Sequence, residues 1–280
     1  MKAPIAWIWI GAFLAFSAAF MVAPAAMLAV QAFSGDDGFT LEYFRTLGEF
    51  RYATSFQNSL ILSVASASVG VVAGGLIAYQ LQKPGVRRAL PAATSFAAVA
   101  ANFAGVPLAF SFIATLGTLG LLTSMLKSIG IDLYGIGFSL FSITGLTVVY
   151  AYFQIPLMLI VFTPALQGML PAWREAAATM GASNWQYWRL VGLPVLMPSL
   201  LASWILLFGN AFSAYATAYA LTAGNIRLVT TQISAVLAGN VSNEPQVGAA
   251  LSLGMIVVMV LVLIASQLVG RRAARWAVKR

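Results

Sequence analysis

EAAATMGASNWQYWRLVGLPVLMP, residues 175–198, interrupts a chain that is otherwise strongly apolar. The stretch opens on Glu175, carries small residues on both sides of Gly181, and closes on Pro194 and Pro198. It is too polar to cross a bilayer. Its regular order of helix formers, a glycine and cap-forming residues nevertheless indicates short helices rather than an irregular loop. The stretch therefore separates apolar runs before and after it, and these runs define the fold.

The composition of the chain is that of a membrane protein. Of its 280 residues, 61% are hydrophobic and only 8% are charged, and the mean hydropathy is +0.90. Soluble domains carry about 25% charged residues, so much of this surface must face an apolar phase. The sequence has no cysteine and no histidine, which argues against disulfides, a zinc site and a hydrolytic triad. We therefore expect neither a metal site nor a catalytic centre.

The net charge of +8 comes from basic residues that stand between and after the apolar runs, most densely in GRRAARWAVKR at residues 270–280. This placement is typical of anchors in the lipid headgroups. A nucleic-acid-binding protein would instead carry a basic stripe. We therefore expect membrane lipid as a partner and no nucleic acid.

Six uncharged runs are long enough to cross a bilayer, which takes about 20 apolar residues. The run 228–243 is shorter and more polar, and is interpreted as part of an external loop. The sequence predicts an all-α membrane protein, a single domain over 1–280 with about six spans. The predicted spans are 6–32, 58–82, 92–117, 140–166, 195–222 and 246–270, followed by a tail at 271–280. The runs 89–126 and 133–173 exceed one span and leave room for extra or re-entrant helices.

Six spans place both ends of the chain on one side of the membrane, and the basic residues indicate which side. With a cytoplasmic N-terminus, 11 of the 15 Lys and Arg residues fall inside and only Arg45, Arg51, Lys127 and Arg227 fall outside. Cytoplasmic segments carry such an excess. We therefore expect both termini in the cytoplasm.

On this topology residues 167–193 form the longest cytoplasmic segment. Pro171 can open a helix, and Gly181 can end it. Ser183 and Gln186 fit a capping box for a second helix at 184–190. The residues alone leave two interpretations open: an amphipathic pair held in the headgroups by Trp and Arg, or a pair of helices that docks on a cytoplasmic partner.

The spacing within this segment resembles the EAA loop of bacterial ABC-importer permeases. The triplet Glu175-Ala176-Ala177 opens the pattern; Gly181 lies six positions after Glu175, and Leu193-Pro194 begins twelve positions after Gly181. The resemblance implies an inner-membrane permease subunit of an ATP-driven solute importer. It also implies that the loop seats coupling helices on a separate ATPase. The residues carried over as the ATPase contact are Glu175, Ala176, Ala177, Gly181, Ala182, Leu193 and Pro194.

The chain lacks the glycine-rich loop that cradles phosphates, because none of its four lysines follows a glycine. ATP and Mg²⁺ are therefore expected on a partner subunit. The resemblance further implies a second permease subunit, a related chain rather than an identical copy, and an extracytoplasmic solute-binding protein. The outer segment 34–56 is a candidate docking place for that protein, or an amphipathic lid. NFAGVPLAF at 102–110 is similar to permeases for polyamines, ferric iron and phosphonates.

Polar side chains inside spans face a bundle interior or a cavity more often than lipid. Asn102, Gln154 and Asn210 are the candidates for the translocation path. No Asp, Glu or Lys falls deep in a predicted span, which weakens the alternative of a secondary transporter driven by an ion gradient. A structural membrane subunit is the other alternative, but it gives no reason for the segment from Glu175 to Pro198.

Overall fold

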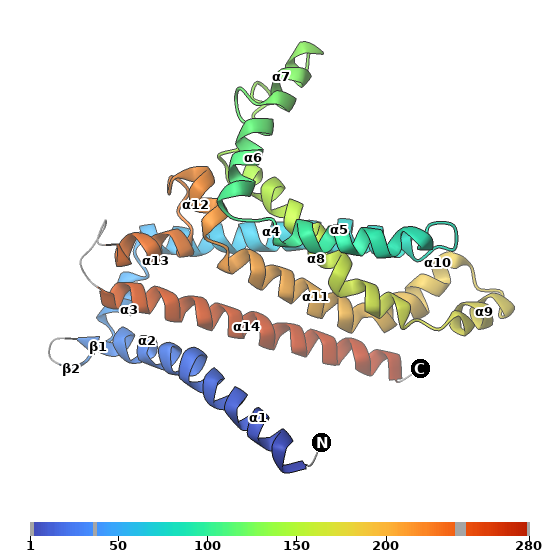
Figure 1. The fold of residues 1–280 in the computed structure, drawn as a ribbon, viewed down its shortest axis with the longest axis horizontal. Coiled ribbons are helices and arrows are strands. Elements are labelled where there is room, and N and C mark those ends of the chain that lie inside the picture. Colours follow the sequence, from blue (N-terminus) through green and yellow to red (C-terminus); the bar gives the residue numbers. More distant parts are fainter. Residues whose placement is uncertain (1–2, 36–37, 239–244, 279–280) are drawn as a thin grey trace. The chain divides into compact units, whose positions relative to one another are not determined.

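A computed structural model describes residues 3–35, 38–238 and 245–278 of the protein, and within these ranges it is mainly helical (Figure 1). Strands β1 (Ser34–Gly35) and β2 (Gly38–Phe39) pair antiparallel. The helices are α1 (Ala3–Ser17), α2 (Ala23–Phe33), α3 (Glu42–Thr46), α4 (Phe50–Leu81), α5 (Leu90–Asn102), α6 (Val106–Leu116), α7 (Leu121–Ser128), α8 (Ile143–Gln167), α9 (Pro171–Thr179), α10 (Asn184–Tyr187), α11 (Leu193–Ser213), α12 (Ala216–Thr222), α13 (Val229–Leu237) and α14 (Pro245–Val278). Shorter helical turns are η1 (Ala18–Val22), η2 (Arg87–Ala89) and η3 (Trp188–Gly192), of which η1 and η3 are π-helical.

Six helical segments of the described chain are long and apolar enough to cross a membrane, which confirms the predicted fold class. These segments are Trp9–Phe33, Phe50–Leu81, Val106–Ser128, Ile143–Gln167, Asn184–Ser213 and Pro245–Leu268. The sixth helix continues as α14 to Val278, so the expected tail at 271–280 is helical up to that residue.

Two predicted spans are not single helices. The span expected at 92–117 is divided, because α5 ends at Asn102 and α6 begins at Val106. Gly105 has φ +77°, a left-handed conformation that cannot continue a right-handed helix. Figure 1 shows α6 leaving the line of α5 at this point. The span expected at 195–222 is likewise divided, between α11 and α12.

The described residues form two compact units, each considered by itself. In the unit of residues 1–56 and 229–258, helix α2 meets α14 through small side chains. Ala32 packs with Ala249 and Ala250, and Tyr52 packs with Val247 and Leu251. The described side chains of α1 and η1 lie almost entirely exposed, so this apolar segment needs lipid or another subunit around it.

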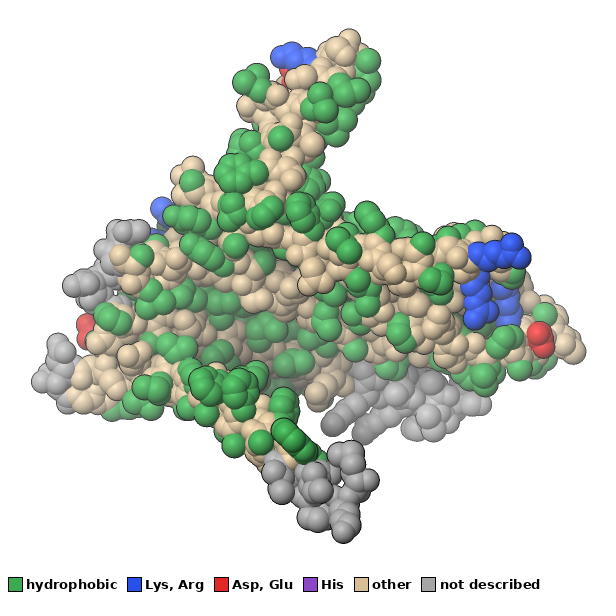
Figure 2. Space-filling model, viewed as in Figure 1, with side chains coloured by type: hydrophobic (Ala, Val, Ile, Leu, Met, Phe, Trp, Pro, Cys, Tyr) green, Lys and Arg blue, Asp and Glu red, His purple; other side chains and the backbone are tan. Residues whose placement is uncertain are grey.

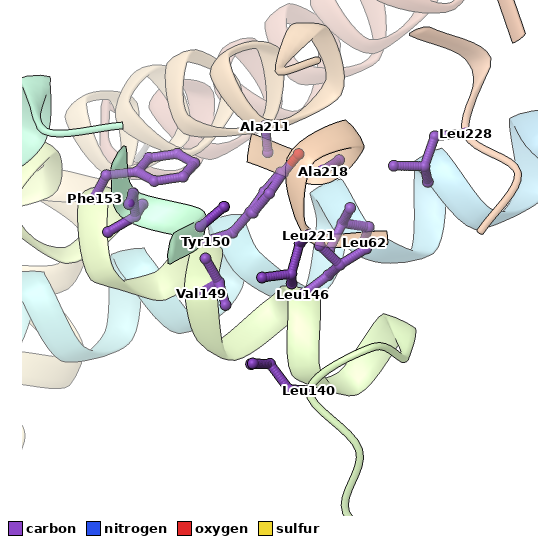
Figure 3. Close-up of a cluster of buried hydrophobic side chains, with 12 residues drawn as sticks. Leu62, Leu140, Leu146, Val149, Tyr150, Phe153, Ala211, Ala218, Leu221 and Leu228 are labelled. Carbon is purple, nitrogen blue, oxygen red and sulfur yellow. The ribbon is translucent and has the colours of Figure 1, made fainter. Parts of the chain in front are cut away.

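The second unit, residues 57–228 and 259–280, is organised around α8. This helix packs against α5, α6 and α11. Its core is a cluster in which Leu146, Val149 and Tyr150 are fully buried together with Leu62 of α4 (Figure 3). Helix α4 approaches α8 closely at Gly70 and Gly74, where a Cβ would come within 3 Å of Gln154 and Ile155.

Candidate coupling loop and translocation path

Helix α9 begins and ends as the sequence predicts. Pro171 occupies its first turn, where no N–H is needed. At its end the N–H of Gly181 donates to the carbonyl of Ala178 (3.0 Å) and that of Ala182 donates to the carbonyl of Ala177 (2.9 Å). This is a Schellman ending, with Gly181 at φ +77° in the left-handed position. Gly181 thus sets a sharp turn after α9.

The capping box predicted for the following helix is present. The backbone N–H of Gln186 donates to the Ser183 hydroxyl (3.2 Å), and the backbone N–H of Ser183 donates to Gln186 Oε1 (2.7 Å). These reciprocal bonds satisfy two N–H groups that a helix start leaves unpaired. Together with Gly181 they fix an elbow between α9 and α10.

The second helix of the loop does not end before the fifth span, contrary to the sequence expectation. The chain is helical without interruption from Asn184 to Ser213. A π-turn lies just before Pro194: the N–H of Leu193 donates to the carbonyl of Trp188, five residues back. A wider turn of this kind accommodates a proline that lacks its own N–H. The proline therefore does not break the helix.

The residues expected to contact the ATPase differ in exposure. Glu175, Ala176 and Gly181 lie on the surface, whereas Ala177 is only 4% exposed. Ala177 therefore offers little surface to a partner in the single chain. Leu193 is 42% exposed. The surface that remains for a partner is the outer side of α9 and the turn at Gly181.

The loop rests on the end of α4 through aromatic contacts. The rings of Tyr79 and Trp188 meet edge to face with centroids 4.9 Å apart, a favoured geometry for aromatic pairs. Lys83 Nζ lies 5.7 Å from the centroid of the Tyr79 ring. A Cβ at Gly192 would come within 2.6 Å of the Trp188 ring, so a glycine is needed there for this packing.

Of the three predicted path residues, Gln154 is the one that the structure buries. It is fully buried in α8, and its Nε2 donates to the backbone carbonyl of Leu207 in α11 (2.7 Å). Asn102 and Asn210 are exposed, and the amide of Asn102 donates to the Ala98 carbonyl of its own helix (2.8 Å). Gln154 is thus bonded to another span, whereas Asn102 is bonded within its own helix.

The two helix breaks are joined by hydrogen bonds of residues outside the predicted path set. The N–H of Gly105, at the break after α5, donates to the Thr217 hydroxyl of α12 (2.7 Å). The Tyr150 hydroxyl donates to the Ala214 carbonyl, at the break after α11 (3.2 Å). Figure 3 shows the Tyr150 hydroxyl directed towards this region. The Gly105-Val106-Pro107 triplet was the available signal for the first break.

Comparisons with known proteins agree with this architecture. Residues 70–275 match the family model described as "Binding-protein-dependent transport system inner membrane component". The chain belongs to this family. The spermidine/putrescine transport system permease protein PotC of Escherichia coli (strain K12) is 25% identical over 268 residues, 93% of each chain. The sulfate transport system permease protein CysT of the same strain is 34% identical over 93 residues, 33% of each chain.

A solved structure shares the fold of this permease. It is a bacterial alginate ABC transporter in complex with an alginate pentasaccharide-bound periplasmic protein. Its matching chain has a TM-score of 0.74 and 20% identity, with 96% of the permease and 95% of that chain covered. Family membership and six apolar helices identify the protein as a bacterial inner-membrane permease subunit of an ABC importer.

Proposed function

We propose that this permease is driven by a separate ATPase that docks on the surface formed by α9 and the turn at Gly181. The proposal rests on the elbow between α9 and α10. It exposes Glu175 and Ala176 on a helix fixed at both ends. A carboxylate on a rigid exposed helix can accept charge-assisted hydrogen bonds from a partner. ATP and Mg²⁺ belong to that partner, and this chain contributes no step of the hydrolysis.

The path from the docking surface into the membrane is continuous helix. From Asn184 the chain runs without a break to Ser213, past Leu207, whose carbonyl is bonded to Gln154. Movement of the elbow would therefore reach α8 through this hydrogen bond. It would reach the break between α11 and α12 through the backbone. We propose that the two joined breaks, together with Gln154, border the translocation path and change its opening.

The proposed assembly contains two permease subunits, the second a related chain rather than an identical copy. The exposed apolar side chains of α1, such as Trp9 and Phe13 at 69% and 68% exposure, need covering. We place the ends of the chain and the coupling loop in the cytoplasm. The segment from β1 to α3, residues 34–46, then faces the other side, where a solute-binding protein can dock. Its exposed charges include Glu42 and Arg45.

The first substrates to test are polyamines, since the spermidine/putrescine permease matches this chain over 93% of its length. Uptake of labelled spermidine, putrescine and sulfate by a host carrying the complete importer would distinguish the two relatives' substrates. Uptake that persists without ATP under an ion gradient would favour the alternative of a secondary transporter.

The ATPase docking is tested by co-purification of the tagged permease from its host in mild detergent. Glu175→Gln removes the charge of the proposed contact without changing its shape, and Glu42→Gln is the matched control on α3. We expect Glu175→Gln to lower the recovered ATPase at least fivefold, and Glu42→Gln to leave it unchanged. Equal recovery with both variants would contradict docking through Glu175.

A further inference from the structure

The base of the coupling loop holds a cavity that the proposed coupling does not use. It has a volume of about 220 Å³ and lies where the ends of α4 and α8 meet α9, α10 and η3. A water molecule occupies about 30 Å³ in the liquid. The cavity therefore has room for a phosphate and its ester group.

The polar groups that line this cavity favour an anion. The Nε2 atom of Gln82 is buried and has no hydrogen-bond partner in the described part of the chain. An unpaired buried donor is unfavourable, so a ligand that accepts a hydrogen bond from it would be stabilised. Arg174 adds a positive charge, and none of the described lining residues carries a carboxylate. Pro171 of the same lining begins α9, so the positive end of that helix lies there.

The aliphatic part of the lining is partly open, and Tyr79, Tyr187 and Trp188 complete the wall as amphipathic aromatic side chains. Leu166, Met169 and Leu170 come from the end of α8 and the turn after it, and Leu170 is 55% exposed. These side chains suit an acyl chain next to a charged headgroup. A freely soluble anion would gain nothing from them.

The surroundings of the cavity are basic. Figure 2 shows Lys and Arg side chains gathered at the end of the molecule where α9 and α10 lie. The basic residues of the adjoining elements are Lys83, Arg87, Arg88, Arg174 and Arg189, all exposed, and Glu175 is the one acid among these elements. Basic pockets between helices at the cytoplasmic side of a membrane bind anionic headgroups.

We propose that this cavity binds the phosphate of an anionic phospholipid, with Gln82 Nε2 and the Arg174 guanidinium as donors. The acyl chains lie along Leu166, Met169 and Leu170. The headgroup then bridges the end of α4 to α9 and holds the elbow between α9 and α10 in place. This proposal rests on the proposed function only in placing the loop at the cytoplasmic surface. Lipid binding itself requires no ATPase.

Native mass spectrometry of the purified full-length chain tests the proposal. The probes are phosphatidylglycerol, phosphatidylcholine with matched acyl chains, and inorganic phosphate alone. We expect phosphatidylglycerol to be retained at least fivefold more than phosphatidylcholine. Arg174→Gln and Gln82→Glu should each reduce this preference to below twofold, the second because a carboxylate repels the phosphate. Arg189→Gln is the control, since this arginine lies on η3 outside the cavity.

Three results would overturn the assignment. The first is an equal preference in the native chain and in Arg174→Gln. The second is an equal loss in Arg189→Gln, which would indicate general surface charge. The third is retention of inorganic phosphate without a preference for phosphatidylglycerol, which would indicate a soluble anion. Melting curves of every variant exclude loss of folding as the cause. ATPase co-purification is measured separately, so failure of the docking proposal is distinguished from failure of this one.

Discussion

The side-chain amide of Gln154 in α8 donates a 2.7 Å hydrogen bond to the backbone carbonyl of Leu207 in α11. This bond links a buried polar side chain of one span to the backbone of another, at the place where α4 also packs closely. A Cβ on Gly70 of α4 would come within 2.7 Å of Leu207 and 2.9 Å of Gln154. Three spans therefore meet at this hydrogen bond.

Replacement of Gln154 separates the contribution of its volume from that of its hydrogen bond. Hydrogen bonds between spans average about 0.6 kcal/mol, and Gln154 Oε1 is buried without a partner. Gln154→Leu should therefore change the free energy of unfolding by less than about 1 kcal/mol. Gln154→Ala leaves a cavity and should cost about 2–4 kcal/mol. Unfolding in mixed micelles measures both, and equal losses would mean that the hydrogen bond dominates.

Neighbouring glycines of α4 offer a matched test of close helix packing. A Cβ at Gly74 would lie 2.6 Å from the Ile155 carbonyl oxygen, whereas one at Gly75 would meet only Met158 Cε at 3.6 Å. Gly74→Ala should destabilise the permease by about 1–3 kcal/mol through overpacking. Gly75→Ala should be neutral or slightly stabilising, because alanine favours the helix by up to about 1 kcal/mol. Thermal unfolding of the two variants measures this difference. If Gly74→Ala were tolerated as well as Gly75→Ala, the close contact between α4 and α8 would be contradicted.

The hydrogen bond from Gly105 N–H to Thr217 is expected to hold the two helix breaks together. Thr217→Val keeps the shape of the side chain but removes the acceptor, which leaves a part-buried N–H unpaired at a cost of about 1–3 kcal/mol. Thr217→Ser retains the hydroxyl and serves as the control. Uptake assays and hydrogen exchange at residues 103–106 should show a loss with valine alone. Unchanged hydrogen exchange at these residues in Thr217→Val would show that this hydrogen bond does not hold the two breaks together.

Gly181 tests the elbow of the coupling loop. A Cβ there meets nothing within 4 Å, so Gly181→Ala acts only through the left-handed backbone, at about 1–2 kcal/mol. We expect weaker recovery of the ATPase with Gly181→Ala and a smaller effect with Gly181→Asn. Gly168 has an ordinary right-handed φ of −74°, and Gly168→Ala should leave recovery unchanged. Full recovery with Gly181→Ala would show that the turn geometry is not needed.

The pH response of the loop between α7 and α8 follows from Asp132. The Gly135 N–H donates to its carboxylate (3.0 Å), and Lys127 Nζ lies 3.5 Å away; both lower the pKa of Asp132, the Gly135 bond more. Because the folded pKa is the lower one, the contribution to stability is complete above the unfolded value of about 3.9. It is lost as the pH falls through the folded value.

Lys127→Gln should accordingly raise the pKa of Asp132 only part of the way, since the Gly135 hydrogen bond remains. A carbon-13 NMR titration of labelled aspartate reports this value, with Asp132→Asn to assign the signal. A full return to the ordinary pKa in Lys127→Gln would mean that the lysine is the main cause.

The elements of the coupling loop could be predicted because local rules determine them. The first turn at Pro171, the left-handed Gly181 and the Ser183–Gln186 capping box each depend on residues within a few positions of one another. The six apolar segments were predictable for a similar reason, since bilayer thickness sets their length.

The parts that could not be predicted depend on contacts between distant segments. The sequence predicted a helix at 184–190 and a separate span from 195, yet a π-turn at Trp188–Gly192 joins them into one continuous helix. The burial of Ala177 and the exposure of Asn102 and Asn210 follow from which face of each helix packs inward, which composition alone does not reveal. Thr217 looked like an ordinary span residue until the structure placed it against Gly105.

The uninterrupted helix from Asn184 to Ser213 has a mechanical consequence. At a rise of 1.5 Å per residue, its 30 residues are about 45 Å long. If the helix pivots as a rod, a tilt of about 5° applied at one end displaces the other by roughly 4 Å. That distance is comparable to the width of a small solute's functional group. A modest rotation at the Asn184 end of the helix would thus displace Ser213, at the break before α12, by several ångströms.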